Sequence, residues 1–488
     1  MLAKRHWVKD FIIIFFLLLF SFIICMKSPI NPFAAHGTSW VDSSVFKYIG
    51  GRMAKGDVPY RDMFDHKGPI IYFLNMLGYY IAPNRGIWVI EFIFMFFSLL
   101  GSYKVVRLFC NVGCSLFIVM IPMSLIFSYF EGGNLVEEYA MPFQIWATYI
   151  YMEYLLNDRI TNIRVVLCGI FFACVLLLRP NMISVWIVFS IAVLLRSIKE
   201  KNITKLIVFL AEFICGMAII IIPSVVYLLL NNAFIDFWFD YIKFNMLYSG
   251  SMGGDVFSEK VKAFFFFLNM KPTLIAFLLM CWSGIQESGR KRRFSVLYVS
   301  YMLVTLFIMC LAGKSFLHYG MTIIPMLVYP YTILFQKCGF GGEGKEGRVE
   351  ILVIGILTIA VVGEAWLGGV KSTVNQILHP NTAREAELQE VIEYIVDNTE
   401  EDEKITVWGN ANYVYTLSGR KSASKYSYQF PIRYVDSFVL EEYFEEIEEE
   451  KPKIVVIMRG MSDKMEQFLD DNMYEMKLDL QGYDVYGR

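Results

Sequence analysis

Long, almost continuous apolar runs are the feature that most constrains this chain. A helix needs about 20 apolar residues, within a range of roughly 17–25, to cross the ~30 Å hydrocarbon core of a bilayer. Hydrophobic residues make up 56% of the 488-residue sequence and charged residues only 18%. This excludes a water-soluble protein of this size and predicts a polytopic bundle of about eleven membrane-spanning helices. We place the spans near residues 10–26, 87–108, 113–130, 139–156, 164–179, 181–196, 206–230, 262–283, 294–312, 315–336 and 350–370.

Positive charge predicts the orientation of these spans. With eleven spans, every basic cluster falls on one face of the membrane, which the positive-inside rule assigns to the cytoplasm. The clusters are Lys4/Arg5/Lys9, Lys104/Arg107, Arg159/Arg164, Arg196/Lys199/Lys201/Lys205, Arg290–Arg293 and Lys337/Lys345/Arg348. The N-terminus is then cytoplasmic. The opposite face receives loop 27–86, segment 131–138, the turn at Arg179, loop 231–261, the turn at Lys314, and everything after about residue 371.

The apolar segment Pro69–Ala82 is too short to be a further span. Its 14 residues would rise only ~21 Å as a helix. Counting it as a span would also place later basic clusters on alternating sides of the membrane. We therefore expect an interfacial helix that closes loop 27–86 on the outer surface.

From about residue 376 the pattern changes to that of a soluble α/β domain. We expect a transmembrane domain over residues 1–375 and an extracytoplasmic accessory domain over 376–488, long enough to carry its own core. The apolar periodicity predicts helices over 383–398, 436–450 and 463–471, strands over 404–408 and 453–458, and a terminal hairpin over 473–480 and 483–486. The turn after Trp408 lacks a G-x-G-x-x-G or Walker sequence, so it gives little support to nucleotide binding.

Loop 27–86 combines acidic and basic groups beside the bilayer. Asp42 would lie in the first turn of a helix over about 42–54, where a carboxylate can cap the helix or accept a proton from a hydroxyl. The residues alone favour these two roles about equally. His66 and Lys67 would suit a phosphate at headgroup depth, although a lysine there can also simply anchor an interfacial helix.

Other charged residues fall in segments predicted to reach the same face. Glu131, Glu137 and Glu138 lie between the third and fourth spans, and the remaining candidates are Asp62, Asp65, Arg179, Lys314, His318 and Tyr319. Charged groups near membrane depth are costly and usually functional. The carboxylates could instead hold a divalent cation, but their spacing does not require a metal. The nine cysteines form no C-x-x-C motif, so neither a cysteine metal site nor a structural disulfide is expected.

These motifs resemble the first external loop of the bacterial integral-membrane glycosyltransferases of the GT-C superfamily. That superfamily includes the protein O-mannosyltransferases and the lipid A aminoarabinose transferases. The resemblance is specific over residues 36–80, through the D-x-x-x-F-x-Y-x-G run from Asp42 and GDVPYRDMFDHKGP from Gly56. It extends more loosely to EGGNLVEEYAMPF, the hairpin at Arg179, the His318-Tyr319 element, and the C-terminal VWG and SGRKSASKYSYQFP segments. Many relatives have a double proline after the lysine, where this chain has HKGP.

The resemblance implies a GT-C-like fold and a polyprenyl-phosphate-linked sugar donor. It implies inverting transfer to a glycan, lipid or protein acceptor outside the cytoplasmic membrane by a hexosyl- or pentosyltransferase. By analogy, Asp42 is the general base and Glu137 or Glu138 is the second acid. Lys67, His66 and Arg179 bind the donor phosphate, while Asp62, Asp65, Lys314, His318 and Tyr319 are candidate contacts for donor or acceptor.

Two alternatives use the same class of lipid-linked glycan. A transporter or flippase would carry charges in the middle of its spans, together with broken or repeated helices. Here the charges concentrate in the outer loops and no internal repeat is evident. A polymerase of cell-surface glycans would add preassembled blocks instead of single sugars. The residues do not specify the sugar, the acceptor, the metal requirement or the oligomeric state, and they provide no evidence for a nucleic-acid partner.

Overall fold

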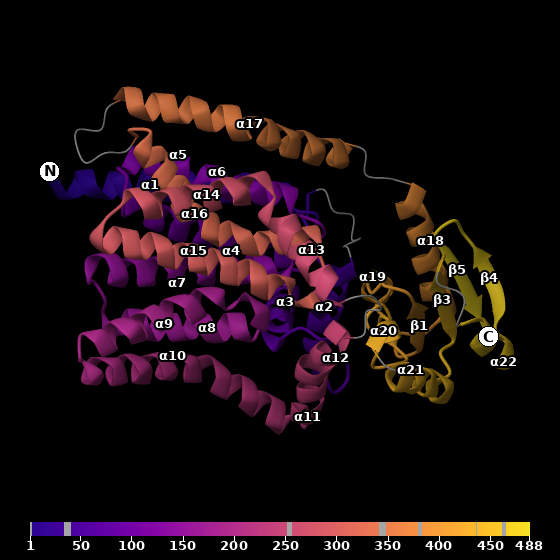
Figure 1. Ribbon diagram of the computed structural model, residues 1–488. Helices are drawn as coiled ribbons and strands as arrows, with labels where there is room; N and C mark the ends of the chain where they lie inside the picture. The colour runs from indigo at the N-terminus through magenta and orange to yellow at the C-terminus, as the bar shows by residue number, and fades with distance from the viewer. Residues whose placement is uncertain are drawn as a thin grey trace.

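The computed structural model describes residues 2–33, 41–250, 256–340, 348–378, 383–435, 437–460 and 465–488. Long helices in the first three quarters of the chain run side by side, and a small sheet lies at one end of them (Figure 1). Up to residue 230 the helices are α1 (Leu2–Met26), α2 (Val41–Met53), α3 (Pro69–Ile81), α4 (Ile87–Arg107), α5 (Val112–Ile118), α6 (Met120–Ser124), η1 (Leu125–Ser128), α7 (Val136–Asn157), α8 (Asn162–Leu176), η2 (Pro180–Met182), α9 (Ser184–Lys199) and α10 (Ile203–Leu230).

The helical part continues through shorter segments and ends in a long helix. These elements are α11 (Phe234–Phe237), η3 (Trp238–Lys243), α12 (Phe244–Gly250), α13 (Val256–Leu268), α14 (Lys271–Gln286), α15 (Gly289–Met309), η4 (Cys310–Ala312), η5 (Leu317–Ile323), α16 (Ile324–Lys337) and α17 (Arg348–Leu378). α17 lies along one side of the other helices and leads toward the sheet (Figure 1). The predicted domain boundary at residues 375/376 falls inside α17, and the division into two domains stays a prediction.

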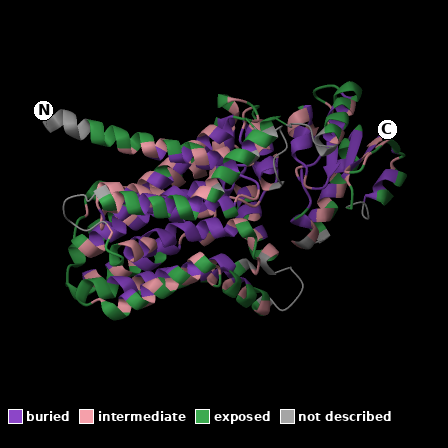
Figure 2. Ribbon diagram, turned by 90° about the horizontal axis from the view of Figure 1, so that it is seen from above, coloured by how far each residue is buried: buried purple, intermediate pink, exposed green. Residues whose placement is uncertain are grey.

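Apolar side chains on the outward faces of the helices fit a lipid environment. Exposed residues line the outside of the helical part, while buried residues fill the space between helices (Figure 2). The most apolar 18-residue window of α10 has a mean hydropathy of 2.6, yet only 11% of that window is buried. Ile207 and Ile214 on this helix are both about 60% exposed, at 61% and 60%. Such a contiguous apolar surface would be unstable in water and is favourable against lipid.

The predicted count of eleven spans is not confirmed. Among the described residues, four helices are long and apolar enough to cross a membrane, or six if each of two bent pairs counts as one span. The remaining predicted spans correspond to shorter or more polar helices. The span over 113–130, for example, is divided into α5, α6 and η1.

One predicted span is wrong as a continuous helix. Residues 262–283 form the end of α13 and most of α14, which meet at an angle of 79°. Pro272 lies in the first turn of α14, where its missing N–H costs nothing. The same residue would break an uninterrupted helix, so the chain bends just before it.

The segment predicted as an interfacial helix is helical and forms α3. Its position relative to the membrane stays a prediction. Its 13 residues are too few to cross a bilayer, and Pro69 begins the helix. α3 packs against α2 and α4 and buries Ile71, Tyr72 and Asn75. It therefore belongs to the protein core as well as to the predicted membrane surface.

The C-terminal part is a five-stranded sheet flanked by helices. The strand order is β2-β1-β3-β5-β4, with β1 parallel to both β2 and β3, β5 antiparallel to β3, and a terminal β4–β5 hairpin. The helices and strands are α18 (Ala383–Asn398), β1 (Lys404–Trp408), α19 (Tyr413–Ser418), β2 (Lys421–Ser422), α20 (Ile432–Val435), α21 (Ser437–Glu450), β3 (Ile454–Met458), α22 (Glu466–Asp471), β4 (Glu475–Asp479) and β5 (Tyr483–Gly487). The predicted α/β pattern is thus confirmed.

This sheet region contacts α2 and the loop between α2 and α3 through specific hydrogen bonds. The amide of Phe64 donates to the carbonyl of Lys425 over 2.9 Å, and the amide of Ser422 donates to the hydroxyl of Tyr48 over 3.0 Å. Lys421 forms an ion pair with Asp57 at 3.0 Å. These contacts hold the C-terminal region against the end of the bundle where α2, α3 and α12 lie (Figure 1).

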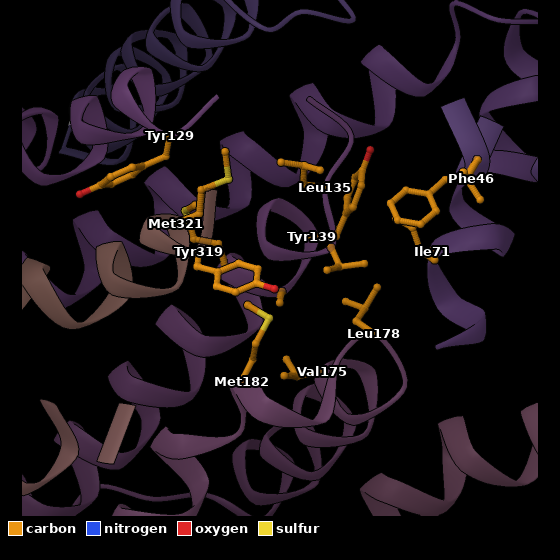
Figure 3. Close-up of a cluster of buried hydrophobic side chains, with 14 of the residues drawn as sticks. Phe46, Ile71, Tyr129, Leu135, Tyr139, Val175, Leu178, Met182, Tyr319 and Met321 are labelled. Atoms are coloured by element: carbon orange, nitrogen blue, oxygen red, sulfur yellow. The ribbon is translucent and has the colours of Figure 1, made fainter. Parts of the chain in front are cut away.

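A buried apolar cluster connects the elements at this end. Figure 3 shows Phe46, Ile71, Tyr139, Leu178, Met182, Tyr319 and Met321 packed among neighbouring helices. They come from α2, α3, α7, the α8–η2 turn, η2 and η5, which are far apart in the sequence. Close packing of such side chains fixes the relative positions of the loops that these elements carry.

Candidate functional site

A cavity of about 320 Å³ lies where the helical bundle meets the C-terminal region. Loops and helix ends from widely separated parts of the chain line it. The lining residues are Asp42, Ser43, His66, Lys67, Glu131, Gly132, Leu135, Glu137, Arg179, Tyr248, Lys314, Phe316, His318, Tyr319, Asn410, Tyr428, Phe430 and Pro431. Leu135 and Tyr319 also belong to the buried cluster of Figure 3, so the cavity wall is continuous with the core.

Asp42 lies in the first turn of α2, as the sequence predicts. Its position favours a carboxylate, because the N-terminal end of a helix carries a partial positive charge. No salt bridge joins Asp42 to another described residue, and its side chain faces the cavity. Residues 36–40 of the resembling motif lie outside the described residues. Asp42 is therefore placed to receive a proton from a group bound in the cavity.

A buried hydrogen-bond network holds His66 and Lys67 in the cavity wall. Asp65, only 2% exposed, accepts hydrogen bonds from the hydroxyls of Tyr428 at 2.5 Å and Tyr72 at 2.9 Å. The Nδ1 of His66 lies 3.3 Å from the same Asp65 carboxylate, and the Nζ of Lys67 lies 2.8 Å from the Nε2 of His66. Asp65 thus orients the two residues that face the cavity.

The electrostatics of this network favour a neutral imidazole. Burial lowers the pKa of His66 well below its ordinary value, and the positive charges of Lys67, Arg179 and Lys314 lower it further. A neutral His66 can donate from Nδ1 toward Asp65 and accept from the ammonium of Lys67 at Nε2. His66 therefore positions Lys67 and adds no positive charge of its own.

Glu137 and Glu138 point to different places. Glu137 lines the cavity and forms an ion pair with Arg179, whose guanidinium lies 4.2 Å from the ring centroid of Tyr319. Glu138 is buried behind the cavity, where its Oε1 accepts from the amide of Leu135 at 3.2 Å. It lies beside Glu91, which accepts a hydrogen bond from Ser28. Only Glu137 of the two predicted acids can reach a molecule in the cavity.

Lys314, His318 and Tyr319 also line the cavity. The Nζ of Lys314 lies 3.6 Å from the ring centroid of Tyr248, and the Nδ1 of His318 contacts the Oε2 of Glu131. Burial lowers the pKa of Lys314 to about 8, with further contributions from Lys67 and Arg179. Lys67, Arg179 and Lys314 all line this one cavity.

Asp62 is not brought into the cavity. Its carboxylate pairs with Arg61 at 2.8 Å and accepts from the amide of Val58 at 2.8 Å, so it stabilises the loop. Asp65 lies behind His66 and does not line the cavity, so neither aspartate is positioned for the predicted contact with substrate. The other predicted site residues, apart from Glu138, converge on the cavity.

The sequence reasoning missed the contribution of the C-terminal region. Asn410, Tyr428, Phe430 and Pro431 form one wall of the cavity, although the sequence predicts only an accessory domain here. Three of these residues lie in the SYQFP run, which belongs to a segment that resembles those of GT-C enzymes. The run combines aromatic and turn-forming residues without a regular apolar period, which is a weak signal for a binding segment.

The described residues do not form a metal site built from protein ligands alone. No group of three or more His, Cys, Asp or Glu side chains among them could hold a metal ion. Two of the three cavity carboxylates already have side-chain partners: Glu137 pairs with Arg179, and Glu131 contacts the Nδ1 of His318. A divalent cation here would need further oxygen ligands besides these side chains.

Comparison with known proteins gives a family and a fold. The family model described as putative competence-induced protein Ccs4 N-terminal domain matches residues 4–348. Comparison with curated proteins gives no match. Among solved structures, ArnT from Cupriavidus metallidurans bound to undecaprenyl phosphate is similar, with a TM-score of 0.65 and 12% identity over 99% of this chain and 98% of ArnT. ArnT in the apo state gives a TM-score of 0.61 and 10% identity over the same shares.

The similarity to the two ArnT structures covers the C-terminal region as well as the helices. The chain has the fold of ArnT, and the resemblance to GT-C enzymes is confirmed at the level of the fold. At 12% identity the comparison establishes the fold alone. What the cavity does has to be argued from its residues.

Proposed function

The chain belongs to the family of the putative competence-induced protein Ccs4 N-terminal domain. From its fold and from the groups that line its cavity, we propose that it is a membrane glycosyltransferase. It moves a sugar from a polyprenyl-phosphate-linked donor to a hydroxyl of an extracytoplasmic acceptor. The observation that carries this proposal is that Asp42, a carboxylate with no salt bridge to another described residue, lines the same cavity as Lys67, Arg179 and Lys314. The similar ArnT protein binds undecaprenyl phosphate, which supports the class of donor.

The chemistry of transfer matches these groups. Asp42 takes the proton of the acceptor hydroxyl while the oxygen attacks the anomeric carbon of the donor. The bond from that carbon to the phosphate oxygen breaks, and its electron pair remains on the phosphate. Lys67, Arg179 and Lys314 stabilise the charge that develops there. A single displacement of this kind inverts the anomeric centre.

The environment of Arg179 supports a role with the donor phosphate. Glu137 and the ring of Tyr319 hold its guanidinium in place before any substrate binds. Preorganised cations need no rearrangement at the moment of reaction, which is what makes such groups effective. Glu137 therefore acts as a positioning residue for Arg179 in this proposal.

Transfer of radiolabelled sugar by the purified protein, from defined polyprenyl-phosphate donors, tests the function. Asp42→Asn should lower kcat by about 10²–10⁴-fold, the range expected when a general base is lost. Lys67→Ala should mainly raise the KM for the donor. Asp62→Asn is the matched control, because Asp62 is in the same loop but pairs with Arg61 outside the cavity.

Two kinds of result would contradict the proposal. Retained activity in Asp42→Asn would remove this residue as the base. Movement of intact lipid-linked sugar across vesicles without transfer would indicate a flippase, and addition of whole preassembled blocks would indicate a polymerase. Cysteine labelling at positions 42 and 67 in a cysteine-free background tests the side of the membrane, and access from the outside is expected.

A further inference from the structure

A second hollow lies at the opposite end of the helical bundle. It has a volume of about 570 Å³ and is lined by Leu155, Ala192, Leu195, Arg196, Lys199, Glu200, Arg290, Arg293, Phe294 and Leu297. These residues come from the end of α7, the end of α9 and the beginning of α15. We call this hollow the basic groove.

The basic groove lies one membrane thickness from the candidate site. α7 contributes Leu135, at its N-cap, to the cavity and Leu155, near its other end, to the groove. These residues are 20 positions apart, which corresponds to about 30 Å along a helix. That distance equals the thickness of the hydrocarbon core. Figure 1 shows α7, α9 and α15 running between the two ends of the bundle.

The charges at the mouth of the groove are only partly balanced. Arg196 pairs with Asp158 and Glu200, and Arg290 pairs with Asp158. Within the described part of the chain, the side chains of Lys199 and Arg293 form no hydrogen bond or salt bridge. Both side chains are exposed. Asp158 thus fixes the two paired arginines, and the other two basic side chains are available to an anion.

The rest of the groove is apolar. Leu155, Ala192, Leu195 and Leu297 line it, and Leu195 is 61% exposed. A free phosphate ion would use only the basic mouth and leave this apolar surface uncovered. A diacyl lipid would place its phosphate among the basic groups and its chains along the leucines. One lipid molecule would then contact both the basic mouth and the apolar part of the groove.

We propose that the basic groove binds an anionic phospholipid of the leaflet opposite the candidate site. Its phosphate contacts Lys199 and Arg293, and its acyl chains lie over Ala192, Leu195 and Leu297. The positive-inside pattern makes this the cytoplasmic leaflet. Basic pockets between helices on that face are known to suit anionic lipid headgroups. This binding site is independent of the proposed transfer reaction.

The test measures the thermal midpoint and native mass spectra of delipidated, detergent-purified full-length protein. Phosphatidylglycerol should raise the midpoint and give a retained one-lipid adduct, whereas phosphatidylcholine with the same chains and inorganic phosphate should not. In Lys199→Gln/Arg293→Gln, lipid affinity should fall about tenfold. Lys291→Gln/Arg292→Gln is the matched control, because it removes the same charge from residues outside the groove and should behave as wild type.

A second variant guards against an effect of charge on folding. Ala192→Phe keeps every charge and fills the apolar half, so it should also weaken phosphatidylglycerol binding. Equal lipid binding by wild type, Lys199→Gln/Arg293→Gln and Ala192→Phe would overturn the proposal. An equal response to phosphatidylcholine would show general lipid coating, and an equal response to inorganic phosphate would show an anion site without a lipid; either result also overturns it.

Discussion

The hydroxyl of Tyr428 links the C-terminal region to the groups that face the cavity. It donates to Asp65 at 2.5 Å, and Asp65 in turn orients His66. Burial raises the pKa of Asp65, while Lys67 and the tyrosine hydroxyls oppose that rise. Removing one donor would leave a buried carboxylate partly unsatisfied, which costs roughly 1.5–3 kcal/mol for a charged group.

We therefore expect Tyr428→Phe to lower kcat/KM for transfer by about tenfold or more, since 1.4 kcal/mol corresponds to a factor of about ten. Asp65→Asn should have a similar effect in the same radiolabel assay. Tyr426→Phe is the control, because Tyr426 bonds to Glu442 at 2.7 Å and does not line the cavity. Equal activity of Tyr428→Phe and wild type would show that this hydrogen bond only holds the C-terminal region against the helices and does not affect transfer.

Lys314 predicts a pH dependence of donor binding. Its pKa is lowered to about 8, chiefly by burial, so the free protein loses this positive charge as the pH rises through that value. The donor phosphodiester keeps its charge over the same range. The KM for the donor should therefore rise several-fold between about pH 7 and pH 9. Lys314→Arg should flatten this profile because arginine stays charged. An unchanged profile in that variant would assign the pH dependence to another group.

Glu137 and Glu138 show what a sequence can and cannot predict at a single residue. The acidic pair at the start of a helix was predictable from its place between two apolar runs. Adjacent residues on an α-helix lie about 100° apart around its axis, so Glu137 and Glu138 point in different directions. The choice depends on how α7 is rotated against its neighbours, and that rotation comes from packing between distant segments.

At the scale of elements, Gly68 sets how closely the α2–α3 loop approaches the hairpin that carries Arg179. Its amide donates to the carbonyl of Leu178 at 3.2 Å. A Cβ at this position would lie 2.0 Å from the carbonyl oxygen of Leu177. The glycine of the HKGP motif, where many relatives have proline, therefore allows a closer backbone contact than any side chain would permit.

Gly68→Ala should separate Lys67 from Arg179, because the backbone must shift to relieve the clash. Overpacking of this kind typically costs about 1–3 kcal/mol. We expect a lower thermal midpoint in detergent and a higher donor KM. Gly51→Ala, on α2, is the control, since the nearest atom would be at an ordinary 3.4 Å. Wild-type donor affinity in Gly68→Ala would mean that the phosphate site does not depend on this approach.

Regular apolar patterns made many elements predictable. The helix over 383–398, the strand over 404–408 and the terminal hairpin appear almost at their predicted bounds. β2, with two residues, is too short to show a pattern and forms only because β1 lies beside it. The bend between α13 and α14 was missed, although Pro272 was a usable signal. Both helices are hydrophobic, so the apolar content of residues 262–283 resembles that of one continuous span and gives no sign of the bend.

At the scale of the whole molecule, the sequence did not predict that the C-terminal region completes the cavity. The contact between Tyr428 and Asp65 joins residues 363 positions apart. Such pairing depends on the shapes of two folded surfaces, and no local period encodes it. The convergence of the loops that carry Lys67, Arg179 and Lys314 on one cavity was predictable, because the basic clusters indicate which loops share a face. The cavity wall that the C-terminal region contributes was not predictable in this way.

The same long-range docking contains a buried contact between a carboxyl group of η3 and a lysine of the C-terminal region. Asp240 is fully buried, and the Nζ of Lys425 lies 3.4 Å from its carboxylate. Burial outweighs the attraction of Lys425 and raises the pKa of Asp240 from 3.8 to about 8. Between these values the folded protein holds a proton that the unfolded chain has released. The contribution of Asp240 to stability is therefore present at low pH and is lost as the pH rises through about 8.

The thermal midpoint of the purified protein should accordingly fall between about pH 5 and pH 8.5, by about 2–4 °C for each kcal/mol lost. Asp240→Asn carries no titrating carboxyl and should reduce this dependence. Asp236→Asn is the matched control, because Asp236 is 3.7 Å from Lys425 but 37% exposed, and it should retain the wild-type slope. If both variants kept that slope, the pH response would belong to groups outside this contact. If only Asp240→Asn lost the pH dependence of the thermal midpoint, that dependence would belong to this one buried carboxyl at the contact between η3 and the C-terminal region.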